Sequence, residues 1–120
     1  MSRFSAPIAE NIWDMKYRLK RADGSAVDNS VEDTWRRIAR ALAENETEPA
    51  RWEDQFYSAL EDFKFLPAGR IAAGAGTARS VTLFNCFVMG TIPDSMGGIF
   101  DMLKEAALTM QQGGGIGYDF

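Results

Sequence analysis

The chain has 120 residues, of which 46% are hydrophobic and 25% are charged, and its formal net charge is −4. These values are close to those of globular domains, which argues against a disordered tail or a fibrous protein, and the negative charge gives no reason to expect direct nucleic-acid binding. The sequence has neither the long apolar run of a transmembrane helix nor the pattern of a signal peptide, so we expect a cytoplasmic protein with no membrane partner.

The first third of the chain carries a short alternating pattern. Met15, Tyr17 and Leu19 alternate with polar residues, which is typical of a β-strand. Asp23-Gly24 marks a turn, and Val27 can begin a return strand. The sequence therefore predicts a small hairpin near the start of the chain.

Two amphipathic helices are predicted next. Ser30 and Asp33 resemble a capping box at the start of a helix over residues 31–44, and Pro49 suits the first turn of a second helix. Apolar residues follow at helical spacing, namely Val31, Trp35, Ile38 and Leu42 in the first helix and Trp52, Phe56, Leu60 and Phe63 in the second. Because the link between them is short, we expect the two helices to pack face to face.

Three arginines lie close together on the first of these helices. Arg36, Arg37 and Arg40 are interleaved with acidic residues, as in a solvated helix face. We therefore interpret them as surface residues and not as a nucleic-acid site.

Small residues dominate positions 68–77, which follow Pro67. A segment with so few large side chains lets the backbone approach a neighbour or a ligand closely. A flexible connector explains the same composition equally well. Both interpretations remain open from the sequence.

The last forty residues predict a βαβ unit. Residues 81–89 are rich in β-branched and aromatic types, as in a strand buried on both faces. Asp94 and Ser95 stand where a helix would begin, and Gly113-Gly114-Gly115 stand where it would end. Residues 116–120 then begin a second strand, so we expect the apolar surface of this unit to need further chain or another subunit to cover it.

Few residues in the chain can carry chemistry. Cys86 is the only cysteine, and histidine is absent, which excludes an internal disulfide and histidine-based catalysis within these residues. A buried cysteine is usually a small apolar side chain, whereas a redox thiol needs a second thiol that this chain does not supply. Asp94 and Ser95 fit either helix capping or the binding of a phosphate and a sugar hydroxyl.

The glycine-rich segments do not match a nucleotide-binding loop. Gly113-Gly114-Gly115 and Gly117 follow a helix instead of opening one, and no Gly-Lys-Ser/Thr sequence completes a phosphate loop. A glycine triplet at the end of a helix supports a tight reversal with bare backbone.

Several motifs, in order and spacing, resemble class II ribonucleotide reductases, which depend on adenosylcobalamin. The resemblance covers almost the whole chain. The motifs are Ala6-Pro7-Ile8-Ala9, Ile12-Trp13-Asp14-Met15-Lys16-Tyr17, Phe65-Leu66-Pro67-Ala68-Gly69-Arg70, Leu83-Phe84-Asn85-Cys86-Phe87-Val88, Asp94-Ser95-Met96 and the run from Met110 to Phe120.

The resemblance implies an α/β fold. Residues 1–66 would form the N-terminal hairpin and helical region, and residues 67–120 the first βαβ elements of a ten-stranded α/β barrel, here incomplete. The chain would be the N-terminal segment of a ribonucleoside-diphosphate reductase, an oxidoreductase that makes 2′-deoxyribonucleotides for DNA synthesis by cobalamin-initiated radical chemistry.

The resemblance also assigns roles to individual residues. Cys86 matches the first cysteine of the dithiol that reduces the substrate and becomes a disulfide. The implied substrate-binding residues are Asn85, Cys86, Gly115, Gly69 and Arg70. Those implied to bind the allosteric effector, a deoxynucleoside triphosphate at a dimer interface, are Asp94, Ser95, Met96 and Gln111.

In that family the radical-forming cysteine, the second reducing cysteine, the acidic base, the substrate-phosphate loop and most of the adenosylcobalamin site lie further along the chain. We therefore expect this segment to be inactive alone and to need the rest of the barrel or a complementary subunit. The resemblance further implies a thiol reductant such as thioredoxin, and a homodimer. The alternatives are a non-catalytic nucleotide-binding or reductase-pairing module, as a split subunit or a truncated remnant.

Overall fold

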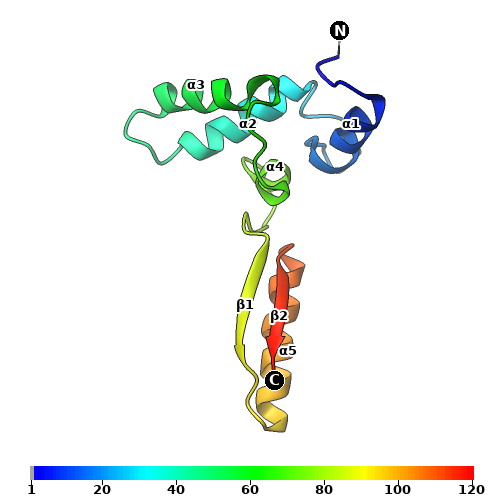
Figure 1. Ribbon diagram of the computed structural model, residues 1–120, viewed down its shortest axis with the longest axis vertical. Helices are drawn as coiled ribbons and strands as arrows, with labels where there is room; N and C mark the ends of the chain where they lie inside the picture. The colour runs from blue at the N-terminus through cyan, green and yellow to red at the C-terminus, as the bar shows by residue number, and fades with distance from the viewer. Residues whose placement is uncertain (1) are drawn as a thin grey trace. The chain divides into compact units, whose positions relative to one another are not determined.

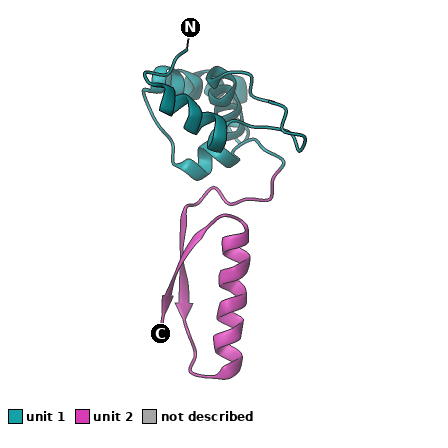
Figure 2. Ribbon diagram, turned by 90° about the vertical axis from the view of Figure 1, so that its right-hand side faces the viewer, with its two compact units in different colours: residues 1–78 teal, residues 79–120 magenta. Residues whose placement is uncertain are grey.

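The computed structural model describes residues 2–120, which divide into two compact units at residues 78 and 79 (Figure 2). The first unit is helical and the second is a βαβ unit. In chain order the elements are α1 (Pro7–Ile12), the π-helical turn η1 (Trp13–Tyr17), α2 (Val31–Ala43), α3 (Pro49–Leu60), the 3₁₀ turn η2 (Glu61–Phe63), α4 (Gly69–Gly74), β1 (Cys86–Thr91), α5 (Met96–Gln111) and β2 (Gly115–Asp119).

The predicted helical hairpin is confirmed, because α2 and α3 lie side by side and run in opposite directions (Figure 1). The Ser30 hydroxyl accepts a hydrogen bond from the Asp33 backbone N–H, and the Asp33 carboxylate accepts one from the Asn29 N–H at 2.9 Å. The first bond satisfies a backbone donor that the first turn of a helix leaves free, and the second joins Asn29, the residue before the cap, to that turn. Trp35 and Ile38 of α2 lie in the hydrophobic core of this unit, at 4% and 2% exposed.

The chain leaves α3 through two residues in the left-handed region, Asp62 and Phe63. Phe63 was predicted to lie on the apolar face of the helix, but it follows the helix in η2. The reversal places the Phe63 ring edge-on against Trp35, with ring centroids 5.1 Å apart. The apolar contact is therefore kept, although the helix has ended.

The predicted hairpin near the start of the chain is wrong in its first strand. Trp13–Tyr17 continue α1 as a π-helical turn because this winding turns Trp13 and Tyr17 toward the core, where Trp13 is 8% exposed. Met15, which the alternating pattern grouped with Tyr17, is exposed. The predicted turn at Gly24 is present, and one antiparallel bridge between Lys20 and Ala26 closes it.

A buried ion pair joins the segments of the first unit. The Arg37 guanidinium donates to the Asp28 carboxylate at 3.0 Å, and both side chains are less than a tenth exposed. Asp28 also accepts from the Thr34 hydroxyl at 2.7 Å and the Leu19 N–H at 3.0 Å, and Thr34 accepts from the Trp13 indole. Such a pair is tolerated in a core only when further hydrogen bonds satisfy both groups, as they do here.

The segment of small residues is used for close approach and not as a loose connector. It forms α4, whose end accepts hydrogen bonds from Arg37 at the carbonyls of Ala72 and Ala75. At Gly76, where φ is +72°, a Cβ would lie 2.9 Å from Cγ of Arg37. Arg37 is therefore not the solvated residue that we predicted, whereas Arg40 is exposed.

The second unit is a parallel βαβ unit, as the sequence predicts. β1 pairs with β2, and α5 packs against both strands. Its first strand differs from the prediction: it covers Cys86–Thr91 instead of residues 81–89, and one face is open, with Val88 99% exposed. The described residues form a two-stranded sheet. The ten-stranded barrel that the resemblance implies stays a prediction.

The two compact units are not divided where we predicted a domain boundary. Residues 67–78 lie with the helical unit. The predicted boundary at residue 67 concerns the barrel of a complete enzyme and stays a prediction. No helix in residues 2–120 is both long and apolar enough to cross a membrane.

Replacing Asp28 with Ala should lower the free energy of unfolding by about 3–5 kcal/mol, because the buried Arg37 guanidinium would lose its counter-ion. Urea unfolding of the whole chain measures this change. The matched control is Asp54→Ala, since Asp54 is 79% exposed and its ion pair with Arg36 should contribute no more than about 1 kcal/mol. Equal, small losses in the two variants would contradict the role given to Asp28.

Candidate functional site

Cys86 opens β1 and lies opposite Gly115, the first residue of β2. The Gly115 N–H donates to the Asn85 carbonyl oxygen at 2.7 Å, so the three residues are held together by the first bond of the sheet. A Cβ added to Gly115 would lie 3.4 Å from the Cys86 sulfur and 3.3 Å from the Asn85 oxygen. The thiol is exposed. The structure therefore brings together Asn85, Cys86 and Gly115, three of the residues predicted to bind substrate.

The chain reaches Gly115 through a tight reversal at the end of α5. Gly113 has φ of +94°, a conformation that residues with a side chain rarely adopt, and its N–H donates to the Met110 carbonyl oxygen at 2.9 Å. The predicted glycine reversal is confirmed. It leaves bare backbone beside the Cys86 sulfur.

The start of α5 has a clear structural role. The Ser95 hydroxyl accepts a hydrogen bond from the Gly98 N–H at 3.0 Å and caps the helix. Asp94 and Met96 flank this cap and are exposed. The capping interpretation of Ser95 is confirmed, and effector binding by these residues stays a prediction.

Gln111 is the last residue of α5 and is exposed. Sixteen helical residues separate the two ends of α5 by about 24 Å. Gln111 is therefore not brought close to Asp94, Ser95 and Met96 within one unit.

Gly69 and Arg70 begin α4 in the helical unit. A Cβ at Gly69 would lie 3.5 Å from the Tyr17 hydroxyl oxygen, and Arg70 is exposed. The predicted contribution of Gly69 and Arg70 to substrate binding stays a prediction.

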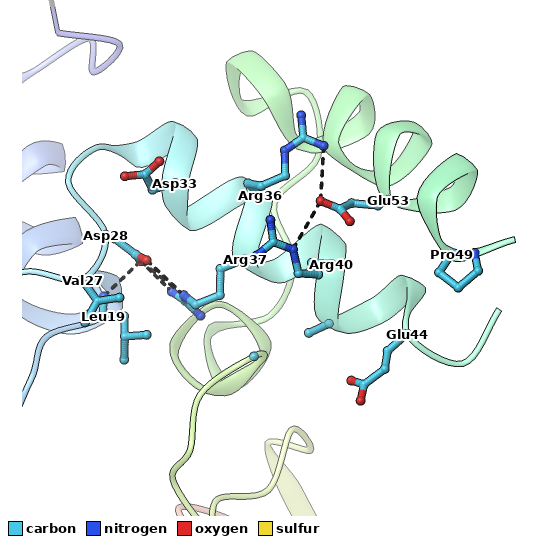
Figure 3. A pocket seen from close by; sticks show the side chains of 12 residues that line it. Leu19, Val27, Asp28, Asp33, Arg36, Arg37, Arg40, Glu44, Pro49 and Glu53 are labelled. Carbon is cyan, nitrogen blue, oxygen red and sulfur yellow. Dashed lines mark hydrogen bonds and ion pairs between the residues drawn. The ribbon is translucent and has the colours of Figure 1, made fainter.

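A pocket of about 820 Å³ in the helical unit gathers the three arginines of α2 (Figure 3). Each of them faces a carboxylate: Arg37 faces Asp28, while Arg36 and Arg40 face Glu53 at 3.6 and 3.5 Å. Because these charges are already compensated, the pocket does not form an anion site. Asp28 was not predicted as a functional residue, because a single carboxylate two residues before Ser30 gives no periodic signal in the sequence.

Comparison with known proteins places both units in one enzyme family. Residues 3–80 match the family described as "Ribonucleotide reductase, all-alpha domain", and residues 84–120 match "Ribonucleotide reductase, barrel domain". The first match alone covers more than half of the chain.

Three curated relatives represent the similarity. The ribonucleoside-diphosphate reductase subunit alpha of Helicobacter pylori is 38% identical over 105 residues, which are 88% of this chain and 13% of the relative. The vitamin B12-dependent ribonucleoside-diphosphate reductase of Mycobacterium tuberculosis is 39% identical over 112 residues, 91% of this chain and 15% of the relative. The enzyme of the same name from Thermoplasma acidophilum is 30% identical over 103 residues, which are 85% of this chain and 13% of the relative. The chain thus spans about one seventh of the length of these relatives.

Replacing Ser95 with Ala should destabilise the first turn of α5 by about 1 kcal/mol, because the Gly98 N–H loses its acceptor. Hydrogen exchange of the Gly98 amide should become faster, whereas Ser95→Asp should keep it slow. Ser58→Ala, an exposed serine on α3, is the control and should leave this amide unchanged. Unchanged exchange in Ser95→Ala would show that the cap does not act.

Proposed function

Because the chain belongs to the ribonucleotide reductase family, we propose that it supplies the all-alpha domain and the first barrel elements of an enzyme that reduces ribonucleoside diphosphates to 2′-deoxyribonucleoside diphosphates. The observation that carries the proposal is the exposed Cys86 thiol beside the bare backbone of Gly115. This arrangement leaves room for a substrate to reach the sulfur. The enzyme would act in the cytoplasm.

Cys86 would be one half of the reducing dithiol. Removing a 2′-hydroxyl from ribose and replacing it with hydrogen consumes two electrons and two protons and releases one water. Two thiols supply both when they join as a disulfide. The chain contains one cysteine, so the second thiol would come from another part of the complete enzyme. A thiol reductant such as thioredoxin would then return the disulfide to the dithiol.

Asn85 and Gly115 would contact the substrate, since both lie at the strand ends beside the Cys86 sulfur. The Asn85 amide can donate to and accept from a sugar hydroxyl. Gly115, which has no side chain, lets the sugar approach the backbone. Gly69 and Arg70 would act on the substrate phosphates, for which an exposed guanidinium is suited.

Asp94, Ser95 and Met96 would bind the deoxynucleoside triphosphate effector, with Gln111 contributing from the other end of a helix. Because about 24 Å separates the two ends of α5, Gln111 and Asp94 would act on one effector only where two chains meet. Effector binding is thus linked to the homodimer. The apolar side chains on the exposed side of α5, Met96, Ile99, Phe100 and Leu103, suit such a contact.

The relatives named vitamin B12-dependent support cobalamin as the cofactor of the complete enzyme. The residues around Cys86 lie on an open strand face and do not form a cradle for a corrin ring. The described residues therefore do not by themselves fit this cofactor. Most of its site would belong to other parts of the enzyme.

Cys86→Ser in a complete reductase that contains this chain should abolish multiple turnover, because the two-electron reduction would lack one thiol. Substrate binding should stay within about threefold of the unchanged enzyme, since a serine keeps the size of the side chain. Turnover with thioredoxin and equilibrium binding of a ribonucleoside diphosphate measure the two effects. Ser80→Ala, an exposed change a few residues earlier, is the control.

The same experiment separates the proposal from a non-catalytic nucleotide-binding or reductase-pairing module. Such a module would bind nucleotide or partner equally well with Cys or Ser at position 86. Sustained turnover of the Cys86→Ser enzyme would rule out the dithiol role.

A further inference from the structure

The first residues of β1 point alternately to its two faces. Cys86 and Val88 lie on the open face, where Val88 is 99% exposed, and Phe87 between them is partly buried on the other face. Successive side chains of a strand always point in opposite directions. Whatever holds Phe87 on its face therefore also decides on which face the Cys86 sulfur lies.

The Phe87 ring packs directly against Gly114, in the space where a side chain at position 114 would lie. A Cβ on Gly114 would lie 2.6 Å from Cε2 and 2.8 Å from Cδ2 of the Phe87 ring, and 3.1 Å from Cγ2 of Thr109. The ring thus occupies the space that a side chain would need. Gly114 itself is buried and is fixed by the hydrogen bond from its N–H to the Thr109 carbonyl oxygen, at 3.1 Å.

A second aromatic ring meets Phe87 from the segment that leads into β1. Phe84 lies edge-on to Phe87, with ring centroids 6.1 Å apart and planes at 70°. Phe87 therefore contacts both the chain before β1 and the turn before β2. In the register of the sheet, Cys86, which precedes Phe87, pairs with Gly115, which follows Gly114.

We propose that Phe87 is a positioning residue for the Cys86 thiol: its ring, seated against Gly114, fixes the register that presents the sulfur on the open face beside Gly115. A strand that slips by one residue turns every side chain to the opposite face. A side chain at position 114 would displace the ring and move the thiol. The catalytic use of the positioned thiol rests on the proposed function, whereas the effect of Phe87 on the strand register does not depend on catalysis.

The test measures the reaction of the Cys86 thiol with an aromatic disulfide in the whole 120-residue chain, where it is the only thiol. Gly114→Ala should change this rate by about tenfold, because the rearranged strand changes how far the Cys86 sulfur is exposed to the reagent. A tenfold change corresponds to about 1.4 kcal/mol. Hydrogen exchange of the Gly115 amide, which bonds to the Asn85 carbonyl oxygen, should become faster in the same variant.

A compensating variant separates positioning from a general loss of stability. Phe87→Leu in the Gly114→Ala chain makes room for the added methyl group, so both the thiol rate and the Gly115 amide exchange should return to within about threefold of the unchanged chain. Gly117→Ala is the control, because a Cβ there has no atom within 4 Å. If Gly114→Ala does not fold, Phe87→Leu alone supplies the same readouts, because the smaller side chain no longer fills the space beside Gly114.

An unchanged thiol rate in folded Gly114→Ala, or a change that Phe87→Leu does not reverse, overturns the positioning role. Where Gly114→Ala does not fold, Phe87→Leu alone decides: a changed thiol rate with faster Gly115 exchange supports the role, and unchanged values overturn it. Failure of the proposed function gives a different result, because a Cys86→Ser enzyme that still turns over leaves these thiol and amide measurements as they are.

Discussion

The parallel pairing of β1 with β2 sets Cys86 opposite Gly115, and the proposed chemistry depends on that one register. In a strand the side chains alternate, so an error of a single residue would exchange the faces of Cys86 and Phe87. Two features specify the register: the hydrogen bond from the Gly115 N–H to the Asn85 carbonyl oxygen, and the Phe87 ring against Gly114. The thiol is thereby presented on an open face, which is what electron transfer to a bound sugar would require.

Both units use a residue without a side chain to admit a large neighbour. In the helical unit Gly76 lies against Arg37, whose guanidinium reaches Asp28 and the carbonyls at the end of α4. In the second unit Gly114 lies against Phe87. A dense interior transmits small displacements, so the exclusion of a single methyl group can fix the position of a whole segment. The absence of a side chain at Gly76 and at Gly114 is therefore explained by Arg37 and Phe87, which occupy the space that a side chain would need.

The sequence predicted those elements whose signals are local. Ser30 and Ser95 cap helices because their hydroxyls meet backbone donors within the same turn, and Pro49 starts α3 for an equally local reason. The π-helical turn was missed because tertiary packing of Trp13 outweighs an alternating pattern. The Asp28–Arg37 pair was missed because burial of a charge depends on partners distant in the chain. For Cys86, composition alone favoured a small apolar residue, and only the family resemblance suggested a reducing thiol.

The proposed function requires that the Cys86 sulfur gives up electrons to a ribonucleotide. The direct measurement is a single turnover of a complete, fully reduced reductase containing this chain, without external thiol, followed by alkylation and peptide mapping. If Cys86 is half of the reducing dithiol, we expect to recover it in an intramolecular disulfide in proportion to the deoxyribonucleotide formed. Recovery of Cys86 as an alkylated free thiol after product has formed would contradict it.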